Sequence, residues 1–384
     1  MILDLSTINF VGGGGESSAP AGKVETVEVN ITMNGVENPT LNEGFSAFGD
    51  VTVNSDNVEN SSALLFTKIG YSEELNTELN AKYNADIAYS KELLDKWNNG
   101  EISNFEWDKK LVYCPKIDTS TITNLGTFFR YCSNLQFIPY LETFNCNYMG
   151  GMFYGCSSLT SIPEINTENV TNMNVMFNEC GNLQYIPYLE TSQVTNMSQM
   201  FSACSSLTSI PEINTSACTN MSGMFTLCRK LQYIPYLETS QVTTMSNMFK
   251  SCDVLTSIPE INTENVTKVN GMFEDCKLLQ SIPLLDFGKV TDIGRFLGWS
   301  NIYSLTDLGG FAGLKIDWND SNGLAICPNL TYQSVMNVLN NLYDFKANGD
   351  DTTTKTLKLH SNSYNLLSAD DIAMANNKGW NITT

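Results

Sequence analysis

Seven cysteines recur at a constant step of 24 residues, and this step is the feature that most constrains the fold of the chain. The row consists of Cys132, Cys156, Cys180, Cys204, Cys228, Cys252 and Cys276. Prolines from Pro139 to Pro283 and leucines from Leu135 to Leu279 keep the same step. A strict period of this length indicates a solenoid, because a single unit cannot bury its apolar face until its neighbours stack on it.

One repeat, residues 171–195, predicts the path of a coil. Its first half has apolar residues at i, i+3, i+4 and i+7, the spacing of one helix face: Met173, Met176, Phe177 and Cys180. The following segment, 183–189, is typical of a short strand with Pro187 at its end or edge. We therefore expect a coil with a helical side and a strand side, with neighbouring coils about 4.8 Å apart.

A second period of 48 residues alternates the residue that follows each proline. This residue is tyrosine in one set and glutamate in the other: Tyr140, Tyr188 and Tyr236, then Glu164, Glu212 and Glu260. Duplication of a two-coil block explains the alternation without any function. The alternative is a strand side that presents rows of tyrosine and glutamate to a glycan or protein partner, since exposed tyrosine offers both stacking area and a hydroxyl. These six residues form the candidate binding face.

The two ends of the chain differ from the repeats. Residues 1–22 combine an apolar segment with the flexible linker Gly12–Gly15. This segment is either a frayed terminus or an anchor that docks on a partner through Ile2, Leu3, Leu5, Ile8 and Phe10.

The changes of sequence pattern along the rest of the chain predict three further domains. Residues 23–113 have the pattern of a small β unit followed by a helical N-terminal cap, and residues 114–295 form the solenoid. Residues 296–384 form a C-terminal cap with helices near 332–342 and 369–377, the second capped by Ser368. The predicted class is therefore α/β, a solenoid of 24-residue coils between a β-plus-helical cap and an α/β cap.

Charge and composition exclude several function classes. The chain of 384 residues has 21 Lys and Arg against 41 Asp and Glu, a net charge of −20. Such a chain repels nucleic acid and anionic membranes. No apolar stretch approaches the roughly 18 residues of a membrane span, and no secretory signal peptide is expected.

The chain offers little to catalysis or cofactor binding. It has one histidine, His360, and lacks the paired-cysteine spacing of zinc sites and the motifs of common nucleophiles. We expect no catalytic residue, metal or cofactor. The cysteines are expected to be buried free thiols rather than a disulfide ladder. The enzymatic alternative is a glycan-active pair formed by Glu164 and Glu212.

The repeat core V-T-N-M-x-x-M-F-x-x-C-x-x-L, seen at 194–207, resembles the BspA-like family of leucine-rich-repeat surface proteins. The resemblance covers about 115–295 and implies a leucine-rich-repeat solenoid that acts in adhesion at bacterial or protist surfaces. Segments 89–93 and 377–380 are similar to parts of proteins from gut Bacteroidetes and their bacteriophages.

Together these features predict a non-enzymatic bacteriophage virion protein, a fibre or decoration component made in the host cytoplasm. Its N-terminal arm is expected to contact other virion proteins, and its solenoid to attach to a glycan or protein receptor on the bacterial surface. Homo-oligomers are possible, whereas nucleic-acid binding and membrane insertion are not expected. The alternative is a bacterial cell-surface adhesin that binds a host protein or glycan.

Overall fold

The computed structural model describes residues 119–136, 138, 141–298, 302–319, 323–350 and 352–384, with isolated positions before them. The chain divides into two compact units, and the first comprises Met1–Asn104, Leu111–Ile117 and Phe137–Tyr140. In this unit β1 (Thr32–Met33) pairs antiparallel with β2 (Val36–Glu37). Ala88, Glu92 and Lys96 are helical. The second unit contains everything described below.

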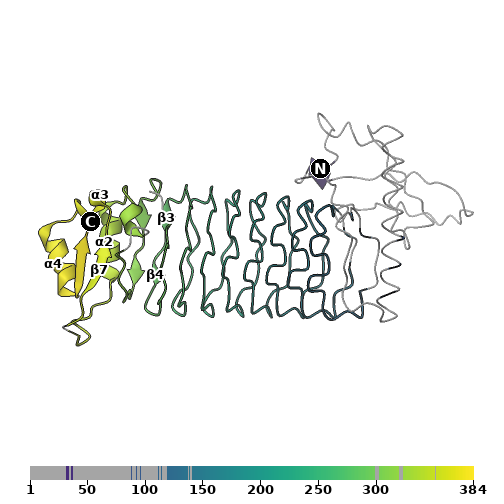
Figure 1. Cartoon of the computed structure of the whole chain (residues 1–384), viewed down its shortest axis with the longest axis horizontal. Coiled ribbons are helices and arrows are strands. Elements are labelled where there is room, and N and C mark those ends of the chain that lie inside the picture. The colour runs from purple at the N-terminus through teal and green to yellow at the C-terminus, as the bar shows by residue number, and fades with distance from the viewer. Residues whose placement is uncertain are drawn as a thin grey trace, which may run out of the picture. The chain divides into compact units, whose positions relative to one another are not determined.

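The second unit is a repeat solenoid whose coils stack one after another (Figure 1). Parallel bridges join residues 24 apart in consecutive coils, and the row runs through Asn124, Tyr148, Asn172, Asn196, Asn220, Thr244, Lys268 and Asp292. Asparagine suits this row because its side-chain oxygen accepts a hydrogen bond from a backbone N–H two residues later. For example, Asn172 Oδ1 accepts from Asn174 N at 2.9 Å.

The side of the coil predicted to be helical is a run of turns instead. Met176 N–H bonds to Met173 O within its own coil, whereas Phe177 N–H bonds to Met200 O in the next coil, at 2.9 Å. Val175, between them, has a left-handed φ of 49°, which an α-helix does not tolerate. The helical prediction was therefore wrong, because helices and stacked turns place apolar residues at the same spacing. Along these turns, every second backbone N–H donates a hydrogen bond to a carbonyl of the neighbouring coil.

The core of the solenoid is built from ladders of identical side chains. Phenylalanine rings of consecutive coils stack 5.5–5.8 Å apart from Phe153 to Phe273, with interplanar angles of 3–16°. All eleven cysteines of the chain are buried, and none forms a disulfide, as predicted. The cysteine row also carries hydrogen bonds between coils, since Cys180 Sγ donates to Phe153 O at 3.1 Å. These thiols are therefore part of the packing.

The opposite side of the coil, predicted to be a strand, is extended but sparsely paired. Within 119–319, the described residues contain strands only late in the solenoid. There β3 (Ser281–Ile282) and β4 (Leu285–Asp286) pair parallel with β5 (Asp307–Leu308) and β6 (Phe311–Ala312). The proline in each earlier segment removes one donor, which weakens a continuous ladder.

Backbone bonding on this extended side follows the 48-residue period. Gln184 N and Tyr185 N both donate to Thr160 O in the preceding coil, at 2.9 and 3.3 Å. The same contact recurs 48 residues later. Between segments 183–189 and 207–213, which are both described, no backbone hydrogen bond forms. The coils are therefore associated in pairs on this side, so the alternation has a structural component.

The C-terminal part of the unit combines helices and a small sheet. It contains η3 (Leu324–Ile326), α2 (Tyr332–Asn341), β7 (Lys355–Lys358), α3 (Ser361–Tyr364), α4 (Ala369–Asn377) and β8 (Trp380–Thr383). β7 pairs parallel with β8, and a bridge joins Trp318 to Leu357. Both helices predicted here are confirmed. Ser368 caps α4 with a capping box that includes Asp371.

None of the helices in the described part of the chain has the length and hydrophobicity of a membrane span.

Candidate binding face

The extended side of the coils presents one continuous surface, which we call the strand face. It consists of the exposed side chains of residues 159–166, 183–190, 207–214, 231–238, 255–262 and 279–286. In each segment three apolar residues point inward, for example Leu183, Ile186 and Leu189. Apart from the proline of each segment, the residues between them point to solvent, and this pattern positions the tyrosines and glutamates predicted from the sequence.

Tyr188 and Tyr236 are exposed on the strand face, with 61% and 62% of their surface accessible. Each phenol donates a hydrogen bond to a glutamate two residues later, Glu190 at 3.0 Å and Glu238 at 3.1 Å. These bonds raise the pKa of both phenols. The rings are held in one orientation at their hydroxyl ends while their faces stay open to solvent.

Glu190 also orders the turn that follows it. Its Oε1 accepts a hydrogen bond from Ser192 N at 2.9 Å, and this contact is the main reason that the pKa of Glu190 is lowered. Glu238 makes the same contact with Ser240 N. The carboxylate therefore links the backbone corner of the coil to the exposed tyrosine ring.

Two further exposed tyrosines were missed by the sequence analysis. Tyr185 and Tyr233 have 55% and 64% of their surface accessible, and they lie three residues before Tyr188 and Tyr236. They follow the same 48-residue period and precede the inward-facing isoleucine, so the alternation of inward and outward residues identifies them. The strand face thus carries two tyrosine pairs, separated by coils that present serine and glutamate instead.

The three predicted glutamates Glu164, Glu212 and Glu260 are all exposed on the strand face. They lie in the coils that alternate with the tyrosine coils. Within the described residues, none of their carboxylates forms a hydrogen bond or ion pair with another side chain. Glu164 and Glu212 stand in an open surface, so the structure gives them no enclosing cleft.

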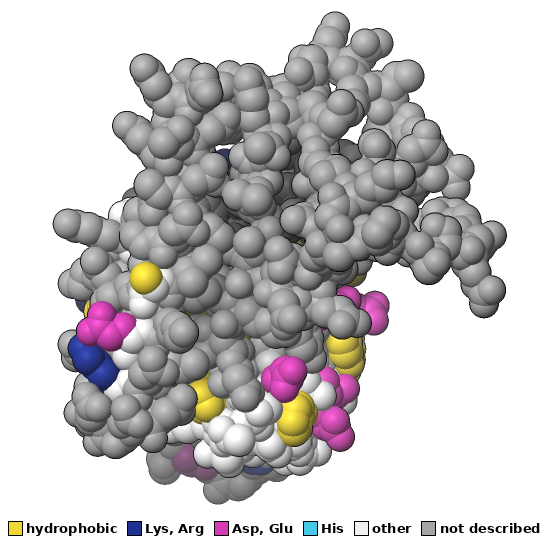
Figure 2. Space-filling view, turned by 90° about the vertical axis from the view of Figure 1, so that its right-hand side faces the viewer, with side chains coloured by type: hydrophobic (Ala, Val, Ile, Leu, Met, Phe, Trp, Pro, Cys, Tyr) yellow, Lys and Arg dark blue, Asp and Glu magenta, His cyan; other side chains and the backbone are white. Residues whose placement is uncertain are grey.

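The strand face is acidic without any compensating cation. Its six segments contain six carboxylates and no lysine, arginine or histidine: Glu164, Glu190, Glu212, Glu238, Glu260 and Asp286. Acidic and apolar side chains also occur side by side on the surface seen along the solenoid (Figure 2). The strand face is therefore a negatively charged surface with exposed aromatic rings, in keeping with the net charge of −20.

Several cations of the solenoid lie elsewhere and are already paired. Asp253, at the corner before the strand side, binds Arg229 at 2.8 Å and Lys277 at 2.9 Å. Lys250 binds the buried Glu274 at 2.9 Å. These ion pairs connect neighbouring coils and do not neutralise the strand face.

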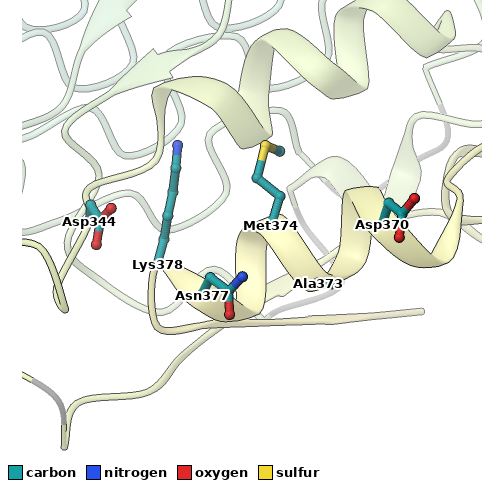
Figure 3. A pocket seen from close by; sticks show the side chains of 6 residues that line it. All are labelled: Asp344, Asp370, Ala373, Met374, Asn377 and Lys378. Atoms are coloured by element: carbon teal, nitrogen blue, oxygen red, sulfur yellow. The ribbon is translucent and has the colours of Figure 1, made fainter.

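A separate hollow of about 470 Å³ lies in the C-terminal part, beside α4 (Figure 3). Among its lining residues, Lys378 donates from Nζ to Leu339 O and Asn340 O at 3.1 and 2.7 Å, which satisfies carbonyls at the end of α2. Partial burial lowers the pKa of Lys378. The lysine therefore has a structural role, and the hollow is not grouped with the strand face.

Some predicted residues lie outside the described part of the chain. They are Tyr140 and the candidate anchor residues Ile2, Leu3, Leu5, Ile8 and Phe10. The described residues contain no group of three or more His, Cys, Asp or Glu side chains arranged to hold a metal ion.

Comparison with known proteins supports the repeat-family resemblance. Residues 101–212, 148–250 and 207–301 match a family described as Mycoplasma protein of unknown function, DUF285, and together they span more than half of the chain. No curated protein matches the sequence. Among solved structures, the crystal structure of a T. pallidum leucine-rich repeat protein is similar at 20% identity. That match covers 44% of this chain and 67% of the other, with a TM-score of 0.23.

Proposed function

We propose a binding function for this chain, which belongs to the DUF285 family of proteins of unknown function. In this proposal the solenoid is a non-enzymatic scaffold, and its strand face attaches the protein to a partner at a bacterial surface. The observation that carries the proposal is the coexistence of four exposed tyrosines with three carboxylates that have no partner among the described residues.

The exposed tyrosine rings of the strand face are suited to an interface with a partner. Tyrosine is a preferred residue at the centres of interfaces, because its ring excludes water and its hydroxyl forms a hydrogen bond. In the coils that lack a tyrosine pair, the equivalent of Tyr185 is a serine, for example Ser209. The solenoid therefore folds without a ring at this position, so packing does not require Tyr185 or Tyr233.

The finer form of the proposal assigns the protein to a bacteriophage particle as a fibre or decoration component. The apolar N-terminal arm, with Ile2 to Phe10, would dock on other virion proteins and leave the solenoid free to reach a glycan or protein receptor. The similarity of segments 89–93 and 377–380 to proteins from gut Bacteroidetes and their bacteriophages supports this form. The buried free thiols fit assembly in a reducing cytoplasm. The region 296–384 would act as the C-terminal cap of the stack.

The second candidate is a bacterial cell-surface adhesin that binds a host protein or glycan. The resemblance of the repeat core to BspA-like surface proteins favours it. Mass spectrometry of purified particles and of envelope fractions separates the two forms. Recovery in particles at structural copy number supports the virion form, and deletion of residues 1–11 should then abolish incorporation while the fold is retained. Recovery only in the envelope supports the adhesin and contradicts the virion form.

Binding itself is tested with the full chain, labelled with a fluorophore and applied to cells of the source culture. The variant Tyr185→Ser/Tyr188→Ser/Tyr233→Ser/Tyr236→Ser removes the exposed rings of the strand face. The matched control is Tyr332→Ser, which removes an exposed ring from α2. We expect the fourfold variant to lose binding and the control to retain it. Equal binding by the wild type and the fourfold variant would refute the proposal.

A further inference from the structure

We infer that the strand face takes a basic, proline-rich polypeptide segment in the polyproline II conformation, with a cationic side chain at every third residue. This inference rests on the proposed binding function and specifies the partner of the same face. Three properties of the described residues carry it: the sign of the charge, the chemistry of the exposed rings, and the spacing of the repeat.

The sign of the charge selects a cationic ligand. The six segments of the strand face contribute a carboxylate in every coil from Glu164 to Asp286 and contain no basic residue. Carboxylates in a row attract lysine and arginine, and like charges across an interface are costly. An anionic ligand, such as a phosphorylated or uronic-acid polysaccharide, would be repelled by every coil.

The exposed rings select a ligand that stacks on tyrosine. The faces of Tyr185, Tyr188, Tyr233 and Tyr236 are open to solvent, and two of the hydroxyls are fixed by Glu190 and Glu238. A guanidinium group stacks on a tyrosine face and also binds a carboxylate. Proline rings pack on tyrosine in the recognition of polyproline II segments.

The 48-residue period is close to the repeat of a polyproline II segment. Successive phenylalanine rings lie 5.7 and 5.8 Å apart, so equivalent positions two coils apart are separated by about 11.5 Å. A polyproline II helix returns to the same face after three residues, a rise of about 9.3 Å. A β-strand advances by about 10 Å over three residues, but residues i and i+3 then point to opposite sides. Polyproline II therefore presents every third side chain on one face, and the remaining difference of about 2 Å between its repeat and the tyrosine coils is within the reach of a flexible arginine side chain.

The polar residues of the tyrosine coils complete the match. Gln184 and Gln232 are exposed beside Tyr185 and Tyr233, and their amides provide donors for backbone carbonyls. A polyproline II segment has no internal hydrogen bonds and keeps its carbonyls available. Side-chain donors can therefore bind it without any edge strand on the solenoid.

The test is fluorescence anisotropy with the full chain and labelled synthetic peptides. The probe repeats the triplet Arg-Pro-Pro. Three comparison ligands are a peptide of the same composition with its arginines clustered, the Glu-Pro-Pro repeat, and the neutral linear oligosaccharide cellohexaose as competitor. We expect the Arg-Pro-Pro repeat to bind about tenfold more tightly than the clustered peptide, because only regular spacing places each arginine on a tyrosine pair. The Glu-Pro-Pro repeat should not bind.

Two variants place the interaction on the strand face. Glu212→Gln/Glu260→Gln should weaken binding of the Arg-Pro-Pro repeat by about fivefold, while the charge-matched control Glu168→Gln/Glu264→Gln, outside the strand face, should leave it almost unchanged. The fourfold tyrosine variant should abolish it. Circular dichroism verifies that each variant is folded. If the fourfold tyrosine variant does not fold, the Glu212→Gln/Glu260→Gln variant still tests whether the peptide binds on the strand face.

The outcomes separate this inference from the proposed function. Loss of cell binding in the tyrosine variant, together with failure of the Arg-Pro-Pro repeat to bind or with competition by cellohexaose, overturns the inference and leaves the binding function standing. Equal affinity for the regular and clustered peptides also overturns it. If the tyrosine variant binds cells as the wild type does, the proposed function fails first.

Discussion

Tyr188 donates its phenolic hydrogen bond to Oε2 of Glu190 at 3.0 Å, while Oε1 of the same carboxylate accepts from Ser192 N. One charged group therefore connects an exposed ring to the backbone corner of its coil. Because the contact recurs at Tyr236 and Glu238, the orientation of the rings is a property of the repeat.

The first prediction concerns this contact. The Glu190 carboxylate raises the pKa of the Tyr188 phenol, because ionisation would break the hydrogen bond and place two negative charges side by side. Glu190→Gln removes the charge and should return the Tyr188 pKa toward its ordinary value of about 10. The pKa is obtained from the difference between ultraviolet titrations of each protein with and without Tyr188→Phe. Glu238→Gln is the control, and an unchanged Tyr188 pKa in Glu190→Gln would contradict the contact.

The second prediction concerns the cysteine row and alkaline pH. Burial raises the pKa of Cys228 and Cys276 to about 12. A raised pKa in the folded state contributes stability that is fully present below the unfolded thiol value of about 8.5, and this contribution is lost as pH rises toward 12. The melting temperature should therefore fall steadily above about pH 9. Cys228→Ala should show a shallower fall, and an identical slope in the two proteins would argue against buried neutral thiols.

A third prediction separates two threonine rows that look alike in the sequence. Thr191 is fully buried and donates from Oγ1 to Asn214 O at 2.7 Å, in the next coil. Thr191→Val keeps the shape of the side chain but removes the hydroxyl that donates to Asn214 O. The free energy of unfolding should therefore fall by about 1–3 kcal/mol. Thr195 is exposed and donates to Thr171 O, so Thr195→Val should cost less than about 0.5 kcal/mol. Urea denaturation measures both changes, and equal costs would mean that the buried row is not structural.

The fourth prediction uses the left-handed turn residue. Val175 has a φ of 49°, and glycine occupies the equivalent position in other coils, for example Gly151 in the preceding coil, with a φ of 65°. Val175→Gly should therefore leave the free energy of unfolding unchanged or raise it by up to about 1 kcal/mol. At Thr195, which lacks a positive φ, the change to glycine should lower it by about 0.5–1 kcal/mol. A larger loss at Val175 than at Thr195 would exclude the turn conformation.

The sequence predicted those features that depend on local pattern or strict repetition. Ser368 and Asp371 form the capping box of α4, and a capping signal lies within a few residues of the helix that it starts. The inward position of Met173 and Phe177 followed from their spacing. The conformation between them did not, because hydrogen bonds to residues in the next coil decide between a helix and stacked turns.

The same limit applied to the candidate binding face. Tyr188, Tyr236 and the three glutamates were identified because each follows a proline of the repeat. Tyr185 and Tyr233 were missed because they do not follow a proline, although their 48-residue period and the inward-facing isoleucine after each of them mark them as outward-facing. The pairing of coils on the strand side was also hidden, since the bond of Gln184 N to Thr160 O is set by stacking.

The most direct test of the central claim replaces Tyr188 with the photo-crosslinking residue p-benzoylphenylalanine in the full chain. The control carries the same residue in place of Thr219, which is exposed away from the strand face. Each protein is bound to cells of the source culture and irradiated, and covalent adducts are identified by mass spectrometry. We expect an adduct with a surface partner from position 188 and none from position 219. An adduct from position 219 with none from position 188 would contradict it.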